Sequence, residues 1–213
     1  MDNDQAADVA VPGSKRFHAA LAASFIIVLV WSVIRPYDLF TWFLEILPAA
    51  AGLVVLLLTY RRFRFSNLAY FLMWVEAIIL VIGGHYTYAE MPLFNWMRDA
   101  FELSRNHYDR VGHFAQGFVP AIVARELLVR TSPLKPGKWL ITLVICICLA
   151  ISAAYELGEW LAAVLTGTRA DAFLGTQGDV WDTQWDMLLA FIGAITAQLV
   201  LSRFHDRSIE KTA

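Results

Sequence analysis

Three pairs of ionisable side chains are spaced so that each pair shares one face of a helix. In each pair the two residues are three or four positions apart: Asp109 and His113, Glu156 and Glu159, and Asp182 and Asp186. Residues at these spacings are neighbours on a helix surface. Carboxylates and imidazoles bind divalent metal ions and also transfer protons. Each of three helices would therefore offer two such groups to a shared site.

The composition is typical of a membrane protein with several spans. The chain has 213 residues, of which 58% are hydrophobic and 17% are charged, and its mean hydropathy is +0.54. These values are too apolar for an ordinary soluble domain. A formal net charge of −2 gives no reason to expect a nucleic-acid partner. We therefore expect an all-α helical bundle in the lipid bilayer, and the sequence leaves its oligomeric state open.

Six apolar stretches are long enough to cross a bilayer, whose hydrocarbon core of about 30 Å requires about twenty helical residues. The predicted spans are 17–34, 39–60, 67–83, 109–129, 139–165 and 182–204. Together they form a membrane domain over 17–204, between a disordered cytoplasmic tail (1–16) and a short charged cytoplasmic tail (205–213). An amphipathic segment, 93–103, is expected to lie along the membrane surface.

The basic residues predict the orientation of these spans. With six spans, the tails and the second and fourth connections share one face. Only five of the 17 Lys and Arg residues fall on the other face: Arg35, Arg98, Arg105, Arg110 and Arg169. The positive-inside rule then places both termini in the cytoplasm of a bacterial inner membrane. With this orientation, all three ionisable pairs lie toward the outer ends of their spans, at one depth.

A divalent metal ion would relieve the repulsion between so many carboxylates in a poorly hydrated cavity. Oxygen ligands with an imidazole suit Mn, Zn, Fe or Mg. The expected metal ligands share the outer end of the bundle: His85, Asp109, His113, Glu156, Glu159 and Asp186. The expected catalytic residues are the three ionisable pairs together, and they include Asp182.

Structural explanations stay open for the same residues. Asp109 and Asp182 each begin a predicted span and could be helix N-caps. Arg110 and Arg169 could neutralise some of the acids, and protonated carboxyls could hydrogen-bond between helices. Glu76, alone in the middle of the third span, is interpreted as a buried, hydrogen-bonded acid. The loop 175–179 is interpreted as a solvated turn rather than a lid.

Four motifs in the chain read GGHYTYAEMP, NHYDRVGHFAQGF, AAYELGEW and GDVWDTQWDML. Together they resemble the YjdF family of bacterial inner-membrane proteins, and the resemblance covers residues 17–204. It implies a six-helix inner-membrane protein and no particular activity.

A more distant similarity is to VanZ-like proteins of the cell envelope. Their helix start, Asp-basic-x-x-His, is matched here by Asp109, Arg110 and His113. Glu159 and Asp186 depart from the VanZ-like pattern, in which Gln and Asn are more usual. The similarity implies a shared polar site and does not imply antibiotic resistance.

The leading functional hypothesis is a metal-dependent envelope enzyme that acts on a lipid or lipid-linked substrate. A metal would activate water or hold phosphate oxygens, and a spare carboxylate would move the proton. Arg105 or Arg110 would bind an anionic headgroup, and Tyr88 is a further candidate for substrate contact.

A proton-coupled transporter and a non-catalytic envelope or stress-resistance module are the alternatives. An enzyme predicts an outward cavity closed below. A transporter predicts a polar path that continues toward Arg125 and Glu126, and a structural module predicts paired acids without a cavity.

Overall fold

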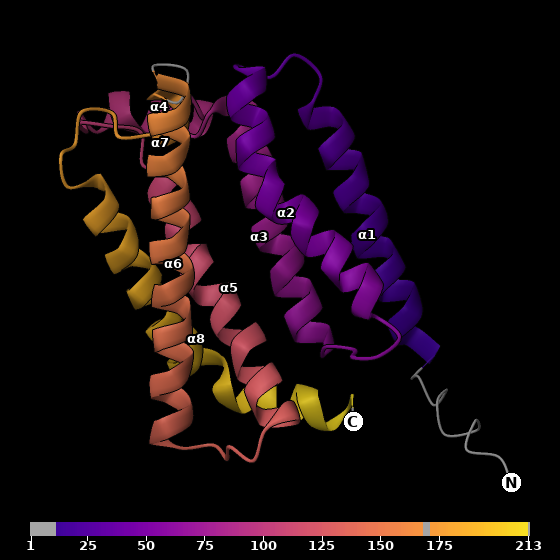
Figure 1. Cartoon of the computed structure of the whole chain (residues 1–213). Helices are drawn as coiled ribbons and strands as arrows, with labels where there is room; N and C mark the ends of the chain where they lie inside the picture. Colours follow the sequence, from indigo (N-terminus) through magenta and orange to yellow (C-terminus); the bar gives the residue numbers. More distant parts are fainter. Residues whose placement is uncertain (1–11, 168–170, 213) are drawn as a thin grey trace, which may run out of the picture.

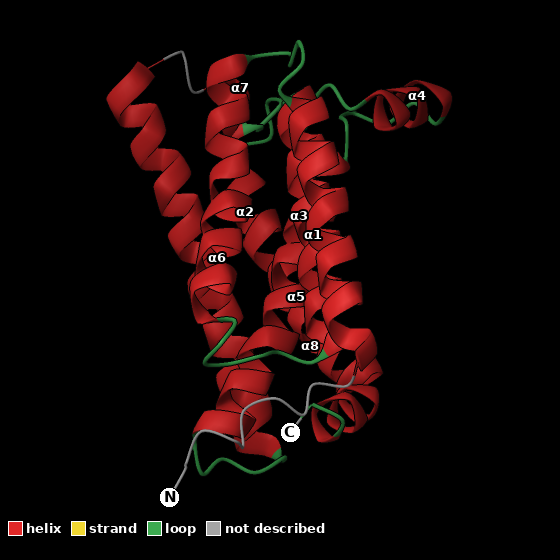
Figure 2. Ribbon diagram, turned by 90° about the vertical axis from the view of Figure 1, so that its right-hand side faces the viewer, coloured by secondary structure: helices red, strands yellow, loops and turns green. Residues whose placement is uncertain are grey.

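Long apolar helices run side by side along one axis in the computed structural model (Figure 1, Figure 2). It describes residues 12–167 and 171–212. Within these ranges five helices are long and apolar enough to cross a membrane. They are α1 (Pro12–Ser32), α2 (Leu39–Thr59), α3 (Asn67–Tyr86), α6 (Lys138–Thr166) and α8 (Asp182–Glu210). The expected all-α membrane bundle is thereby confirmed.

Local signals in the sequence set several of the helix ends. The carboxylate of Asp38 accepts a hydrogen bond of 2.7 Å from the backbone of Thr41 and so caps α2. The Ser66 hydroxyl caps α3 through the backbone of Ala69. α1 begins at Pro12, inside the predicted N-terminal tail, of which residues 1–11 lie outside the described part. α8 continues to Glu210 and thus includes most of the predicted C-terminal tail.

α5 (Tyr108–Thr131) is the innermost long helix. It packs against α3, α6 and α8, and half of its 24 residues are buried. It is not one of the five apolar helices because it contains acidic and basic side chains at both ends. Its neighbours enclose those side chains, so a helix of mixed polarity can lie inside an otherwise apolar bundle.

Two glycines bring the backbones of α5 and α8 into direct contact. A Cβ atom added to Gly117 would overlap the carbonyl oxygen of Ala190, and one added to Gly193 would overlap the carbonyl oxygen of Phe114. Small residues permit this approach, which is a common way for membrane helices to associate. The two helices start at the same end of the bundle and run in the same direction (Figure 1).

Two short helices lie at the end of the bundle where α5 begins. α4 (Pro92–Ala100) projects to the side of the bundle (Figure 2) and has no buried residue. Leu93, Trp96 and Phe101 are exposed along this segment, so its expected position on the membrane surface stays a prediction. α7 (Asp171–Leu174) follows the end of α6.

A separate network of buried polar groups closes the opposite end of the bundle. Glu126 of α5 is fully buried and accepts hydrogen bonds from the backbone and hydroxyl of Ser66, both of 2.7 Å. Its carboxylate also binds Arg130 at 2.8 Å and lies 3.0 Å from Nε2 of His205. Every lone-pair direction of this carboxylate is therefore used in joining α3, α5 and α8.

Apolar packing separates this network from the end of the bundle at which α5 begins. The main hydrophobic core lies between them and includes Ala121, Ile122, Val144, Cys148 and Ala194. The polar groups of α5 thus form two clusters, one at each end of the helix.

Candidate functional site

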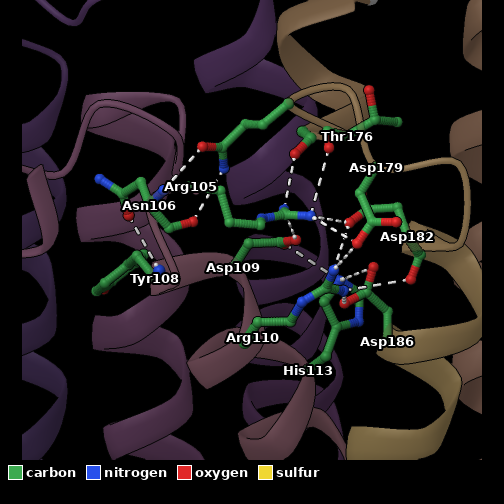
Figure 3. A network of polar contacts seen from close by, with 12 residues as sticks. Arg105, Asn106, Tyr108, Asp109, Arg110, His113, Thr176, Asp179, Asp182 and Asp186 are labelled. Carbon is green, nitrogen blue, oxygen red and sulfur yellow. Dashed lines mark hydrogen bonds and ion pairs between the residues drawn. The ribbon is translucent and has the colours of Figure 1, made fainter. Parts of the chain in front are cut away.

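The contact between α5 and α8 sets two of the three ionisable pairs at one level. Gly117 meets Ala190, and His113 and Asp186 lie one turn earlier on the two helices. Asp109 and Asp182 lie a further turn toward the end of the bundle. Because the helices run in the same direction, their polar faces stay in register (Figure 3). The prediction that residues far apart in sequence share one depth is confirmed for these two helices.

Asp109, His113 and Asp186 form the centre of the site. Nε2 of His113 lies 3.3 Å from Oδ1 of Asp109 and 3.9 Å from Oδ2 of Asp186. All three residues are buried, with exposed fractions of 8%, 5% and 2%. One ligand atom from each lies within 4.8 Å of the others. Metal–ligand distances of about 2.0–2.2 Å place opposite ligands about 4 Å apart, so the three residues could hold one metal ion.

Arg110 orients Asp186 from one side. One guanidinium nitrogen binds Oδ1 of Asp186, and the other lies 2.8 Å from Asp182 and 3.1 Å from Asp179. Asp186 therefore uses one oxygen for the arginine and turns the other toward the histidine. Partners of this kind fix the direction of a carboxylate ligand.

Arg105 orients Asp109 in the way that Arg110 orients Asp186. Its guanidinium lies 3.3 Å from Oδ2 of Asp109, binds Asp182, and donates to the backbone carbonyls of Gly175 (3.0 Å) and Thr176 (3.3 Å). Both guanidinium groups of this cluster are thus engaged by carboxylates. The contacts support the alternative in which arginine neutralises the acids, whereas binding of an anionic headgroup stays a prediction.

The loop 175–179 covers the site from the end of the bundle. The side-chain amide of Gln177 accepts a hydrogen bond from the backbone nitrogen of Asn106 (2.9 Å) and donates one to its carbonyl oxygen (3.0 Å). Asn106 is itself fully buried and donates to Met91 and Asn95. The tip of the loop, Gln177 and Gly178, is an exposed turn, as the interpretation as a solvated turn expects, and the carbonyl groups of Gly175 and Thr176 also cover Arg105.

A small cavity adjoins the aspartate–histidine group on the side of α2 and α6. Its free volume is about 20 Å³, enough for one water molecule or one ion. Its lining consists of Glu45, Leu80, Tyr88, Asp109, Gly112, His113, Gln116, Tyr155 and Glu159. Glu45 is buried, and one of its oxygens accepts a hydrogen bond of 3.3 Å from the Tyr155 hydroxyl.

Sequence reasoning missed Glu45, Asp179 and Tyr155. Glu45 carried a usable signal, because an acid inside an apolar span is costly and commonly marks a site. Asp179 and Tyr155 carried none, since one lies in a loop and the other is an aromatic residue of an aromatic-rich membrane chain.

Both members of the third pair, on α6, reach the cluster. Oε1 of Glu156 lies 3.7 Å from Nδ1 of His113 and has no hydrogen-bond partner among the described residues. Glu159 faces the cavity. The predicted convergence of three helices therefore holds in the geometry, while the chemical roles of these residues stay predictions.

Other predicted residues lie elsewhere. Nδ1 of His85 is 2.8 Å from the carbonyl oxygen of Ser32, its ring lies tilted against that of Trp31, and it does not line the cavity. The side chain of Glu76 is partly buried and makes no hydrogen bond within the described ranges, so the interpretation as a buried, hydrogen-bonded acid was wrong. Arg169 lies outside the described residues.

The N-cap alternative for the two aspartates is also wrong. The capping positions of α5 and α8 are His107 and Trp181, and neither makes a side-chain capping bond. Asp109 and Asp182 lie inside the first turns, where a negative charge suits the helix dipole, and their side chains turn toward the arginines.

The turn after α3 places Tyr88 in the cavity wall. Thr87 and Tyr88 both have left-handed backbone conformations, with φ of 51° and 52°, and the backbone of Tyr88 bonds back to Gly83 at 2.9 Å. Its ring fills the space where a Cβ of Gly83 or Gly112 would lie. Burial, with the nearby Glu45 carboxylate, raises the pKa of the Tyr88 hydroxyl well above its ordinary value, so this group is neutral.

Comparisons with known proteins agree with this architecture. Residues 17–207 match the model of a family described as "Predicted membrane protein (DUF2238)". The chain is 47% identical to "Inner membrane protein YjdF" of Escherichia coli (strain K12) over 190 residues, which cover 89% of this chain and 91% of the relative. No solved structure matches. The chain is therefore a multi-pass inner-membrane protein that belongs to the DUF2238 family of membrane proteins.

Proposed function

We propose that the protein is a six-span, metal-dependent enzyme that acts on a lipid or lipid-linked substrate at the outer side of the inner membrane. The single observation that carries this proposal is the convergence of Asp109, His113 and Asp186, whose ligand atoms lie within 4.8 Å. Each aspartate has one oxygen held by an arginine and the other directed at the histidine. Such preorientation is expected of a binding site and is not needed for simple charge neutralisation.

The six-span topology includes α5 as a crossing. α1 starts and α8 ends at the same end of the bundle (Figure 1), which requires an even number of crossings. The 24 residues of α5 extend about 36 Å at 1.5 Å per residue, enough for a core of about 30 Å. The excess of basic residues at that same end supports cytoplasmic termini. The site then faces outward, where envelope lipids are accessible.

The proposed chemistry follows from the groups around the candidate metal site. A divalent metal at Asp109, His113 and Asp186 would activate water or hold phosphate oxygens of a substrate. Glu156 supplies a carboxylate oxygen without a hydrogen-bond partner within the described ranges, next to the histidine. It is the group best placed to accept a proton from that water. Arg105 and Arg110 orient the ligands in this proposal and do not bind the substrate.

The packing favours an enzyme over a proton-coupled transporter. Transport requires a polar path from the site toward the opposite end of α5. Ala121, Ile122 and Ala194 lie between the two ends and are fully buried in an apolar core. Glu126 at the far end is saturated by its own partners. The non-catalytic alternative predicts acids without a cavity, whereas a small cavity adjoins this site.

The test is the metal content of protein purified in detergent, measured by mass spectrometry after loading with Mn, Zn, Fe or Mg. We expect bound metal in the wild type and at least a tenfold weaker affinity in Asp186→Asn and in His113→Gln. Asp186→Asn is a suitable variant because Arg110 still forms ion pairs with Asp179 and Asp182. Asp99→Asn is the matched control, since Asp99 is exposed and its one ion pair among the described residues is with Arg98. Failure of every metal to bind to folded wild-type protein would overturn the proposal.

A further inference from the structure

The two ring nitrogens of His113 face different partners along α5. Nε2 lies 3.3 Å from Oδ1 of Asp109, one turn earlier, and 3.9 Å from Oδ2 of Asp186. Nδ1 lies 3.3 Å from Oε1 of Gln116, one turn later. Spacings of four and three residues place Asp109, His113 and Gln116 on one face of the helix. The ring therefore points one nitrogen at two carboxylates and the other at a neutral amide.

Gln116 is the partner of Nδ1 at hydrogen-bond distance among the described residues. Oε1 of Glu156 also faces Nδ1, but at 3.7 Å it lies beyond the range of a hydrogen bond. The side chain of His113 is only 5% exposed, so bulk water does not replace the amide. Tyr155 packs against the ring from the side, with the two ring centroids 6.1 Å apart. The hydrogen bond to Gln116 thus determines how the second nitrogen is used.

A metal ion on Nε2 requires the imidazole proton to be on Nδ1. A neutral imidazole carries one proton, and the nitrogen that binds a metal is the unprotonated one. Histidine ligands ordinarily donate their remaining N–H to a nearby acceptor, such as a carboxylate or carbonyl oxygen, which fixes the tautomer and the direction of the ring. The amide oxygen of Gln116 is an acceptor of this kind. It adds no charge, so two aspartates would still balance one divalent ion.

We infer that Gln116 is a positioning residue of the candidate metal site, because it accepts a hydrogen bond from Nδ1 of His113 and so presents Nε2 to the ion. The inference rests on the proposed function, since it concerns the same metal site. The competing arrangement reverses both hydrogen bonds. In it the amide nitrogen of Gln116 donates to Nδ1, and Nε2 keeps its proton and donates it to Asp109. That arrangement leaves no ring nitrogen for a metal beside the aspartates.

The first measurement is nitrogen NMR on the full-length protein in detergent, loaded with Zn²⁺ and with an NMR-active nitrogen isotope in its histidines. The chemical shifts distinguish a protonated, a bare and a metal-bound ring nitrogen, and His113→Gln identifies the signals of His113. We expect Zn²⁺ on Nε2 and the proton on Nδ1. Binding of Zn²⁺ through Nδ1 would overturn the inference without any variant of Gln116.

The second measurement is the Zn²⁺ affinity by equilibrium dialysis. Gln116→Met keeps the size of the side chain and removes the acceptor, so it should bind Zn²⁺ about tenfold more weakly, as expected when a metal ligand loses its outer partner. Gln116→Glu keeps an oxygen at the same position and should bind at least as tightly as the wild type. Gln184→Met is the matched control with unchanged affinity, because Gln184 is exposed near the start of α8.

The outcomes separate this inference from the proposed function. Equal Zn²⁺ affinity in the wild type and in folded Gln116→Met overturns the role of Gln116 and leaves the metal site in place. Equal weakening in Gln116→Met and Gln116→Glu would assign the effect to packing and also overturn that role. A wild-type protein that binds no metal and keeps a proton on Nε2 contradicts both proposals. If Gln116→Met does not fold, the ring nitrogen that carries Zn²⁺ in the wild type decides.

Discussion

Gly117 on α5 lies so close to the carbonyl group of Ala190 on α8 that a methyl group does not fit between them. This contact fixes the separation of the two helices one turn before it, where His113 meets Asp186. The distance between these two proposed ligands is therefore set by backbone packing. A change at Gly117 should act on stability and on metal binding together.

Gly117→Ala is expected to lower stability by about 1–3 kcal/mol, because the new methyl group forces the helices apart, and to weaken metal binding. Gly158→Ala is the matched control, since nothing lies within 4 Å of a Cβ at Gly158. It should raise stability by about 0.5–1 kcal/mol, the usual gain when alanine replaces glycine in a helix. Thermal unfolding in detergent measures both. Equal melting temperatures for the two variants would show that the helices do not pack this closely.

Arg110→Gln is expected to destabilise the protein by about 3–5 kcal/mol, because it leaves buried carboxylates without their counter-charge. Adding Asp186→Asn removes one of those charges, so the double variant should be more stable than the sum of the single effects predicts. The measurement is a double-mutant cycle of thermal unfolding. Arg98→Gln, at a surface arginine that is 35% exposed and pairs with its neighbour Asp99, should leave stability unchanged. Strict additivity would mean that the ion pair between Arg110 and Asp186 does not form.

Glu126→Gln tests whether the two ends of α5 act independently. The amide loses charge-assisted hydrogen bonds to Ser66 and Arg130, so we expect a loss of about 2–3 kcal/mol. The metal content should stay at the wild-type value, because the apolar core separates Glu126 from the proposed metal ligands. Glu210→Gln, at an exposed acid in the last turn of α8, is the control. Loss of metal from a folded Glu126→Gln protein would indicate coupling through the bundle, as a transporter requires.

Reporter fusions test the topology. A fluorescent protein that matures only in the cytoplasm should be bright at either terminus. Alkaline phosphatase, which is active only outside the inner membrane, should be active when inserted after Leu103. With five crossings the two termini would lie on opposite sides, so a bright N-terminal fusion with a dark C-terminal one would exclude α5 as a crossing.

The sequence predicted the depth of the site better than its internal pairing. Spacing and orientation were enough to bring Asp109, His113, Asp182 and Asp186 to one level, because helical periodicity and span direction fix height along the bundle. They do not fix rotation about each helix axis or the position of a loop. The pairing of Arg105 with Asp182, 77 residues later, depends on both.

The prediction for His85 and the omission of Glu45 have a related cause. His85 and Glu45 are each single ionisable groups near or inside an apolar span, and nothing in their neighbourhood distinguishes them. The structure places Glu45 in the cavity wall and His85 against Trp31. Contacts between α2, α3 and the rest of the bundle decide this difference, and local sequence does not encode them.

The mixed polarity of α5 has a consequence for biogenesis. A charged side chain near the middle of an isolated membrane helix costs about 2.5–3.5 kcal/mol on insertion, and α5 carries charges at both ends. The acids that bind Arg110 lie in and just before α8, which follows α5 and α6 in the chain. Arg110 therefore gains its counter-charges only after α8 has been made. We expect α5 to reach its final placement at that stage, and chains truncated before α8 to be degraded as incompletely folded.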